Sequence, residues 1–231
     1  MTDLFLIRHA QASFGADDYD CLSPLGERQA ALLGAWFARR GRRPGRIVTG
    51  RLRRHAQTAQ GCLRAAGVEA PALVLPGLDE LDADELLAGY RPDLTSPDAL
   101  RRVLAAEADP RRAFQTLFAA AVARWMAGTH DHAYRVTWTQ FQAAVRGAWD
   151  ELAQQPAREL WVFTSGGPIG VIAAALLGVP PERSFDLSWP LVNTSVSRIH
   201  IGRRARQLIS YNGWAHLESD GDAGESLVTH R

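Results

Sequence analysis

The sequence predicts an α/β fold of three layers, in which helices cover both faces of a mostly parallel central sheet and a helical cap is inserted. Short apolar runs alternate with amphipathic helical patterns along most of the chain, which is typical of parallel sheets. The first run, residues 4–7, is apolar at every position, as expected for a strand buried on both faces. A helical pattern broken by several prolines then interrupts this alternation. We interpret it as the inserted helical cap and place it at about residues 82–134. We expect a single domain over residues 1–218 and a flexible polar tail over residues 219–231.

The first half of the chain is predicted to supply three strands and two helices. Ser23 and Pro24 are a helix-start signal, and apolar residues recur from there at helical spacing until Gly41. Gly67 closes a second helical pattern in the same way. The expected order is a strand at 4–7, a helix after 23, a strand at 47–48, a helix at 52–66 and a strand at 73–75.

The alternation resumes behind the cap. Apolar side chains lie on one helical face after Trp138, and a later apolar strand runs directly into a Gly-Gly-Pro sequence that opens a helix. Two β-rich runs near the end of the chain then predict a closing strand pair. The expected elements are a helix at 138–152, a strand at 160–163, a helix at 166–177 and strands at 196–201 and 207–211.

Composition excludes several classes of function. The 26 basic and 25 acidic residues give a net charge of +1, so the overall field offers no case for nucleic-acid binding. Every basic residue is arginine, which excludes a Schiff-base or P-loop lysine. Two distant cysteines suggest neither a disulfide framework nor a zinc site. With neither a signal-peptide pattern nor a run of about 20 apolar residues, we expect a cytoplasmic protein that does not bind membranes.

Arg8 and His9 follow directly on the first strand, at the sheet edge where ligands of such folds collect. A neutral imidazole nitrogen can attack phosphorus, and a guanidinium presents a planar fork of donors to phosphate oxygens. Arg54, in the first turn after the second strand, is a candidate for a second phosphate contact, with Arg51 and Arg53 as open alternatives.

Two further candidates lie at other strand ends. Glu80 follows the third strand and could protonate a leaving oxygen, although Asp79, Asp82 and Asp84 compete for that role. Ser165 and Gly166 stand where the 160–163 strand meets a helix, so the hydroxyl and the following amides are placed to bind an anion. His130 and His132 flank Asp131 without further ligand spacing, and no metal site is predicted.

Four segments in order resemble the histidine phosphatase (phosphoglycerate mutase-like) superfamily. Residues 6–13 resemble its RHG motif, 52–58 its L-x-R-A-x-x-T helix start, 78–81 its acid loop and 165–167 its H-G-G turn. The resemblance implies that His9 forms a transient phosphohistidine, that Arg8 and Arg54 bind the phosphoryl oxygens and that Glu80 is the proton donor. It further implies phosphate or substrate contacts from the group Ser165, Gly166, Gln11 and Ser13, and chemistry without a cofactor or metal.

Two departures from the family pattern stand out. Ala10 replaces the usual glycine of the first motif, which is a mild change also found in small phosphohistidine phosphatases of the superfamily. Ser165 replaces the usual second histidine, and no other histidine aligns with the missing one. Losing one donor to the transferring group would cost about a hundredfold or more in turnover unless something compensates.

The leading hypothesis is therefore a metal-independent phosphatase of a small phosphorylated substrate. Hydrolysis is favoured over mutase chemistry, because Ala12 and Gly15 stand where mutases carry polar substrate-binding residues. The second hypothesis is a catalytically impaired phosphate-binding or regulatory protein. A third is a serine hydrolase using Ser165 with Asp186 and His216, although Phe163 stands where a nucleophile elbow needs glycine. No motif names the substrate or the oligomeric state.

Overall fold

The computed structural model describes residues 1–13, 20–94, 96–218 and 226–230. Within it the chain forms two compact units. The first, which we call the sheet unit, contains Met1–Glu80 and Ala144–Arg231, and the second, the inserted unit, contains Leu81–Ala143. The stretch predicted as a cap, about 82–134, lies wholly within the inserted unit.

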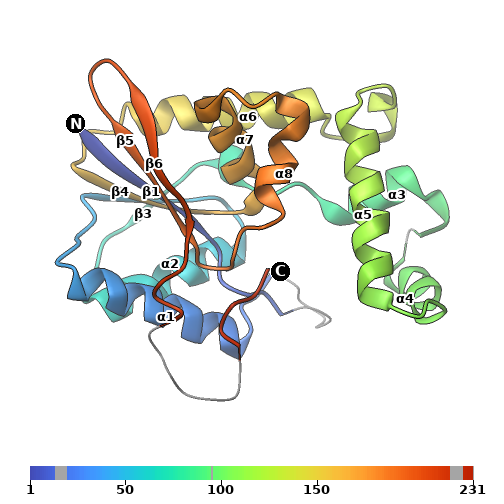
Figure 1. The fold of residues 1–231 in the computed structure, drawn as a ribbon, viewed down its shortest axis with the longest axis horizontal. Helices are drawn as coiled ribbons and strands as arrows, with labels where there is room; N and C mark the ends of the chain where they lie inside the picture. Colours follow the sequence, from blue (N-terminus) through green and yellow to red (C-terminus); the bar gives the residue numbers. More distant parts are fainter. Residues whose placement is uncertain (14–19, 95, 219–225, 231) are drawn as a thin grey trace. The chain divides into compact units, whose positions relative to one another are not determined.

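The sheet unit is built on six strands in the order β3-β2-β4-β1-β5-β6 (Figure 1). The four strands from β3 to β1 are parallel, whereas β5 and β6 are antiparallel to their neighbours. This confirms the predicted mostly parallel sheet and its closing strand pair. The strands are β1 (Thr2–Arg8), β2 (Arg46–Thr49), β3 (Ala72–Val74), β4 (Glu159–Thr164), β5 (Val196–Ile201) and β6 (Arg206–Gly213).

Helices cover both faces of the sheet, which gives the predicted three layers. Helices α1 and α2 lie side by side on one face, and α6, α7 and α8 lie on the other (Figure 1). The short helix α8 was not predicted, since its sequence carries no helical periodicity long enough to read. The bounds are α1 (Pro24–Arg39), α2 (Arg53–Ala66), α6 (Trp138–Ala153), α7 (Gly166–Leu177) and α8 (Ser184–Ser188).

Local signals set the ends of the helices on the first face. The Ser23 hydroxyl accepts a hydrogen bond from the Gly26 amide at 3.0 Å and caps α1. Gly67 ends α2 in the left-handed conformation with φ of +64°, which costs glycine little because it has no Cβ.

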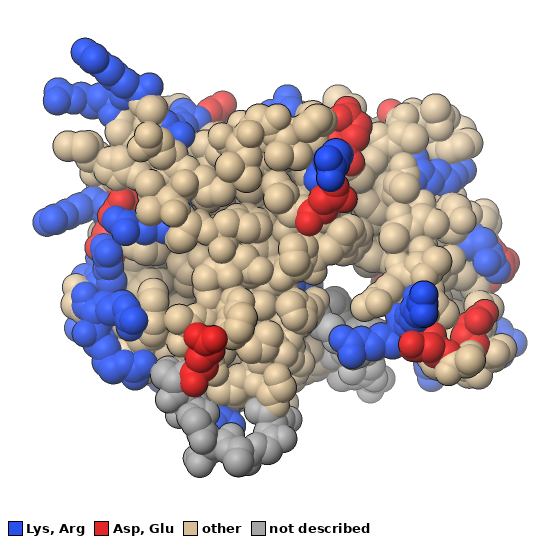
Figure 2. Space-filling model, in the orientation of Figure 1, with Lys and Arg blue, Asp and Glu red and all other residues tan. Residues whose placement is uncertain are grey.

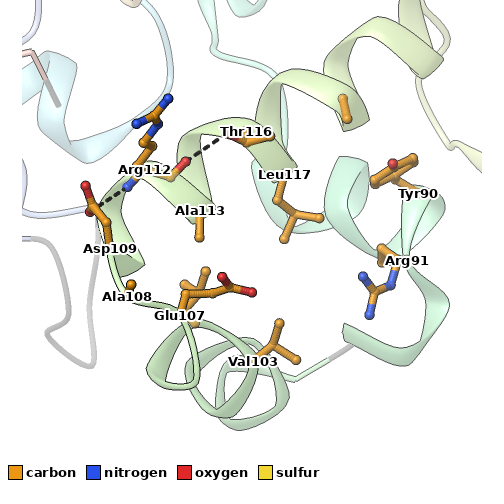
Figure 3. Close-up of a pocket in the computed structure, with 12 residues that line it drawn as sticks. Tyr90, Arg91, Val103, Glu107, Ala108, Asp109, Arg112, Ala113, Thr116 and Leu117 are labelled. Carbon is orange, nitrogen blue, oxygen red and sulfur yellow. Dashed lines mark hydrogen bonds between the residues drawn. The ribbon is translucent and has the colours of Figure 1, made fainter.

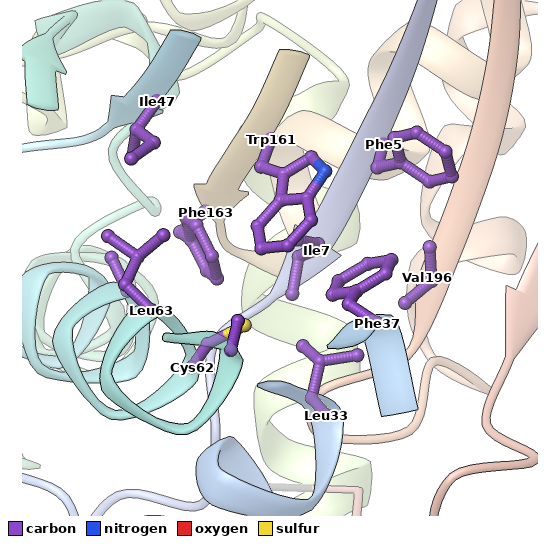
Figure 4. Close-up of a cluster of buried hydrophobic side chains, with 12 residues drawn as sticks. Phe5, Ile7, Leu33, Phe37, Ile47, Cys62, Leu63, Trp161, Phe163 and Val196 are labelled. Carbon is purple, nitrogen blue, oxygen red and sulfur yellow. The ribbon is translucent and has the colours of Figure 1, made fainter. Parts of the chain in front are cut away.

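The main core lies between the sheet and the α1–α2 layer (Figure 4). Phe37 from α1 stacks on Trp161 from β4 with ring centroids 4.1 Å apart, and it meets Phe5 from β1 edge to face. Cys62 and Leu63 pack on the same cluster from α2. These contacts anchor α1 and α2 to the strands, and the segments that run from strands into helices are fixed with them.

The inserted unit contains α3 (Ala83–Tyr90), α4 (Pro97–Ala105) and α5 (Pro110–Met126). Its core is aromatic and includes the start of α6, since Trp125 is buried against Trp138 and Phe141 with ring centroids 5.2 and 5.5 Å apart. A pocket of about 530 Å³ opens between the ends of these helices (Figure 3). Its lining residues include Tyr90, Arg91, Val103, Glu107, Asp109 and Arg112.

Part of the predicted flexible tail is packed. Residues 219–225 and 231 lie outside the described residues, whereas residues 226–230 pack within the sheet unit. Leu227 is buried with Val192 and Leu217, and its carbonyl accepts a hydrogen bond from Gln29 Nε2 at 2.8 Å. A single leucine in a polar stretch gave no periodic signal, so this contact was not foreseen.

Exposed arginines gather at the edge of the sheet where the parallel strands begin. They follow the end of α1 and line the turn between β5 and β6, and Figure 2 shows blue side chains clustered there. Ile201 at the end of β5 pairs with Thr2 at the start of β1, so this edge is opposite the carboxyl ends of the parallel strands. Among the described residues, no helix is long and apolar enough to cross a membrane.

Candidate active site

The carboxyl ends of β1, β2 and β4 meet at one edge of the sheet. Arg8 at the end of β1 pairs with Thr164 at the end of β4, and Thr49 at the end of β2 pairs with Phe163. The register therefore brings three chain segments together: the one after β1, the turn into α2 and the turn into α7. The candidate residues on these segments therefore lie at the same edge of the sheet.

His9 is held in one orientation by hydrogen bonds to two backbone carbonyls. Its backbone N–H donates to the Thr164 carbonyl at 2.8 Å, and its side chain is only 4% exposed. The ring Nδ1 lies 2.8 Å from the Ala10 carbonyl oxygen, which can only accept, so Nδ1 carries the proton. In the neutral ring Nε2 then has a free lone pair, as a nucleophile requires.

The surroundings keep the His9 ring neutral. Burial lowers the pKa of His9 well below its ordinary value, and the nearby charges of Arg54 and Arg8 lower it further. Both effects disfavour the protonated imidazolium. The nucleophilic form is therefore present throughout the neutral pH range.

The structure distinguishes Arg54 from its two neighbours. Arg54 is 8% exposed, and its charge acts on the pKa of His9. Arg51 is exposed and binds Asp79 through its backbone N–H and its Nε, both at 2.6 Å. Arg53 is exposed, and its backbone N–H donates to Asp20. Of the three, Arg54 is the arginine beside His9.

Arg8 lies at the end of β1, and its charge also reaches His9. Its Nη1 donates to the Leu191 carbonyl, and its Nη2 donates to the His230 carbonyl at 3.3 Å. These bonds fix the direction of the guanidinium. The side chain is thus positioned by the segment after α8 and by the end of the chain.

Glu80 reaches the N-terminus of α7. Both of its carboxylate oxygens accept from the Gly167 amide, at 3.1 and 3.2 Å, so the acid lies beside Ser165 and Gly166. Asp79, its nearest competitor, is engaged with Arg51. Asp82 caps α3 by accepting from the Glu85 amide in the inserted unit. Glu80 is therefore the acid that the sheet unit presents at this helix end.

The first motif is braced from α1 and α2. The Gln11 backbone N–H donates to the Gln29 side chain at 2.9 Å, and the Gln11 Oε1 accepts from the Ser23 hydroxyl at 2.8 Å. The Ser13 backbone N–H donates to the Cys21 carbonyl at 2.8 Å. Thr58 on α2 accepts from the Ala10 amide at 3.0 Å. The predicted substrate contacts of Gln11 and Ser13 remain predictions.

Sequence comparison decides the family. A model of the histidine phosphatase superfamily (branch 1) matches residues 4–113 and 106–213, which together make up most of the chain. The chain belongs to the histidine phosphatase superfamily. No match is found among curated proteins.

Solved structures of other histidine phosphatase folds are similar along most of their length. Alpha-ribazole phosphatase from Shigella flexneri has a TM-score of 0.66 at 18% identity, over 92% of this chain and 96% of that one. Mycobacterial glucosyl-3-phosphoglycerate phosphatase in complex with inorganic phosphate has a TM-score of 0.64 at 22% identity, over 94% of this chain and 99% of that one. A mutant of phosphoserine phosphatase from Entamoeba histolytica in complex with phosphoserine has a TM-score of 0.63 at 17% identity, over 94% of this chain and 100% of that one. At these identities the likeness shows the fold.

The most informative departure from the histidine phosphatase pattern involves a residue that the sequence reasoning missed. Ser165 is fully buried at the N-cap of α7, and its Oγ lies 2.7 Å from Nε2 of His55. No histidine of the sequence aligns with the position of Ser165, but His55 reaches the Ser165 hydroxyl in space from the first turn of α2. A signal was present in the sequence, because His55 stands where the L-x-R-A-x-x-T helix start has alanine.

Two further residues of this histidine phosphatase site were not foreseen. Asp20 binds Arg54, with its Oδ1 2.8 Å from Nη1, and also accepts from the Arg53 amide at the start of α2. Thr194 has a φ of +62°, which is rare for a β-branched residue, and its N–H donates to the carbonyls of Arg8 and His9. Neither arrangement has a local sequence signature, since each joins residues that are far apart in the sequence and meet only in the folded chain.

The alternative serine hydrolase triad does not form. His216 Nε2 lies 2.9 Å from the Thr194 hydroxyl, and Asp186 pairs with Arg183. The imidazole beside Ser165 belongs to His55 instead. In the part of the chain that the structure describes, His130 and His132 do not join a third ligand in a cluster fit for a metal ion.

Proposed function

We propose that this protein is a phosphomonoester hydrolase that forms a phosphohistidine on His9. The observation that carries the proposal is the state of the His9 ring. Its Nδ1–H is committed to the Ala10 carbonyl, and burial with two neighbouring arginines keeps the ring neutral. The Nε2 lone pair is thereby available next to two cations that suit a phosphoryl group. Membership of the histidine phosphatase superfamily supports the same reaction.

In the first step, Nε2 of His9 attacks phosphorus, a P–N bond forms and the bond from phosphorus to the leaving oxygen breaks. Arg8 and Arg54 neutralise charge on the phosphoryl oxygens, and the N-terminus of α7 with Ser165 and Gly166 supplies further donors. Glu80, at the same helix end, gives its proton to the leaving oxygen.

In the second step, water attacks the phosphorus of the phosphoenzyme. Glu80, now a carboxylate, accepts a proton from the water as the new P–O bond forms and the P–N bond breaks. Inorganic phosphate leaves, and His9 returns to its neutral form. We propose that this chemistry runs without a metal ion, because the arginines and helix-end donors provide the electrostatic stabilisation.

The proposed substrate is a small phosphorylated molecule. The similar structures are named as phosphatases of phosphoserine, glucosyl-3-phosphoglycerate and alpha-ribazole phosphate, all small phosphate esters. We assign binding of the substrate to Gln11 and Ser13 beside the first motif. The inserted unit is proposed to select the substrate, because its pocket of about 530 Å³ has the size of a small-molecule site.

The test is hydrolysis of p-nitrophenyl phosphate by the native protein and by His9→Ala, each with and without EDTA. The expected result is turnover that survives EDTA and disappears in the variant. A phosphoenzyme that is labile to acid and stable to alkali should accumulate when the native protein is quenched during turnover. Turnover that persists without His9, or that EDTA removes, would contradict the proposal.

A second candidate function is phosphate binding without turnover. The observation that favours it is Ser165, which stands where the family pattern has its second histidine, so that one donor to the transferring phosphoryl group is shortened and its possible positive charge is lost. Calorimetry with inorganic phosphate distinguishes the two functions. Binding that depends on Arg54, with neither turnover of any phosphomonoester nor a phosphoenzyme, would establish the second.

A further inference from the structure

His55 occupies a space that the backbone leaves for it. Its side chain is fully buried, and its ring centroid lies 5.9 Å from that of His9. A Cβ added to Gly50 would lie 2.4 Å from Nδ1 of His55, closer than real Cβ contacts occur. Any side chain at position 50 would therefore displace the imidazole, so glycine there is a condition of this arrangement.

The position of the proton on His55 follows from its two ring nitrogens. Nε2 faces the Ser165 hydroxyl, whereas the buried Nδ1 has no hydrogen-bond partner among the described residues. Buried N–H groups without a partner are rarer in proteins than buried acceptors without one. The proton therefore belongs on Nε2, which donates to Ser165 Oγ. Burial and the charge of Arg54 lower the pKa of His55 to about 3, so the ring is neutral.

This bond decides what the serine hydroxyl can do. Ser165 is the N-cap residue of α7, yet its side chain makes no capping bond to its own helix. Since Oγ accepts from His55, its own proton remains to be donated to another acceptor. The ring of His9, where the phosphoryl group is proposed to arrive, lies next to that of His55.

We propose that His55 is a positioning residue for phosphoryl transfer, which holds Ser165 so that the serine hydroxyl donates a hydrogen bond to the phosphoryl group on its way to His9. This inference rests on the proposed function and concerns the same site. His55 and Ser165 together replace the donor that a histidine at position 165 would provide. The pair gains and loses no proton during the reaction.

The experiment compares kcat, KM and vanadate affinity among variants of the whole chain. The set is His55→Ala, Ser165→Ala, the double variant of both changes, and the exchange variant H55A/S165H, with the exposed His132→Ala as a matched control. Vanadate mimics the transferring phosphoryl group and reports on the site even where turnover is too slow to measure.

Each single variant should lower kcat about tenfold or more with little change in KM, since a transition-state donor is lost. Vanadate should bind correspondingly more weakly. The double variant should be no slower than the worse single variant, because both changes remove the same donor. The exchange variant should recover most of the rate, which a merely structural role for His55 would not predict. His132→Ala should behave like the native protein.

Some results would overturn the inference and leave the proposed function standing. These are a His9-dependent enzyme in which His55→Ala keeps its kcat and vanadate affinity, or single effects that add in the double variant. Labelling of Ser165 by a fluorophosphonate would also overturn it, because a serine nucleophile must give its proton to His55. If the native protein neither hydrolyses p-nitrophenyl phosphate nor binds vanadate, the proposed function fails and the inference fails with it. Ser165→Ala, which leaves the His55 ring in place, keeps the test valid if His55→Ala unfolds.

Discussion

The two units of the chain differ in their buried polar side chains, which among the described residues all lie in the sheet unit. In the sheet unit, His9, His55 and Ser165 are buried. The His9 backbone donates to the Thr164 carbonyl of another strand, and the His55 ring bonds the Ser165 hydroxyl. In the inserted unit, the described charged side chains are exposed or partly buried, as in the pairs of Arg91 with Asp93 and of Arg135 with Asp82. Its pocket combines apolar lining residues such as Val103 and Leu117 with a partly buried Arg91 and an exposed Arg112.

We expect this difference to separate the residues that carry out the reaction from those that select the substrate. A buried group with fixed partners cannot change without a large cost, whereas exposed pairs contribute little to stability and tolerate substitution. We therefore expect reaction chemistry to depend on the sheet unit and substrate choice to depend on the inserted unit.

The largest effect is expected at His9. His9→Ala removes the nucleophile and should lower kcat for p-nitrophenyl phosphate by at least about 10⁴-fold, measured by steady-state kinetics. The matched change in the inserted unit, His132→Ala, should leave kcat unchanged. Equal losses in both variants would break the proposed division between the units.

Glu80→Gln should lower kcat about 10²–10⁴-fold for an alkyl phosphate, because an alkoxide leaving group needs the proton. The loss should be much smaller for p-nitrophenyl phosphate, since nitrophenolate leaves without protonation. The comparison of the two substrates is the measurement, and the exposed Asp84→Asn in the inserted unit is the control. A loss that does not depend on the leaving group would argue against Glu80 as the proton donor.

Stability should fall on acidification. Burial lowers the pKa of His216 to about 4, whereas the unfolded chain titrates this group near 6.5. Below pH 6.5 the unfolded state binds a proton that the folded state does not, so the free energy of unfolding decreases as pH falls. From pH 7 to pH 5 this group should contribute a decrease of roughly 2 kcal/mol.

Urea unfolding of the native protein and of His216→Asn at both pH values measures that contribution. Each protein's own value at pH 7 is its reference, which removes the effect of losing the bond to Thr194. The variant should lose less stability on acidification than the native protein. An equal loss would show that His216 is not held neutral in the fold.

The smallest effects are expected at the pocket of the inserted unit. Arg91→Ala and Arg112→Ala should leave kcat for p-nitrophenyl phosphate within about twofold of the native value, because neither lies in the sheet unit. Their kcat/KM for larger phosphorylated substrates should change by about tenfold, as a lost charge-assisted contact would predict. A parallel loss with p-nitrophenyl phosphate would place the inserted unit in the chemistry.

Sequence reasoning succeeded where the information is local. Ser23 and Gly67 mark helix ends, and the continuous apolar run in β1 indicates a buried strand, because capping and burial act within a few residues. The same reasoning placed His9 and Ser165 at strand ends. Their common edge then followed from the parallel topology.

It failed where a contact joins distant segments through a particular turn. His55 and Ser165 are 110 positions apart and meet only because β2 and β4 pair in register. Asp20 finds Arg54 across a loop, and Leu227 reaches Val192 from the end of the chain. No periodicity or capping signal predicts such long-range contacts, since they depend on the directions of side chains in the folded chain.

Gly50 has a consequence for the history of this site. A side chain at position 50 leaves no room for the imidazole at position 55, so we expect relatives with His55 to carry Gly50 as well. We therefore expect positions 50, 55 and 165 to change together, with glycine required before or together with the histidine. A search that requires a histidine at position 165 would discard every descendant of that route as inactive.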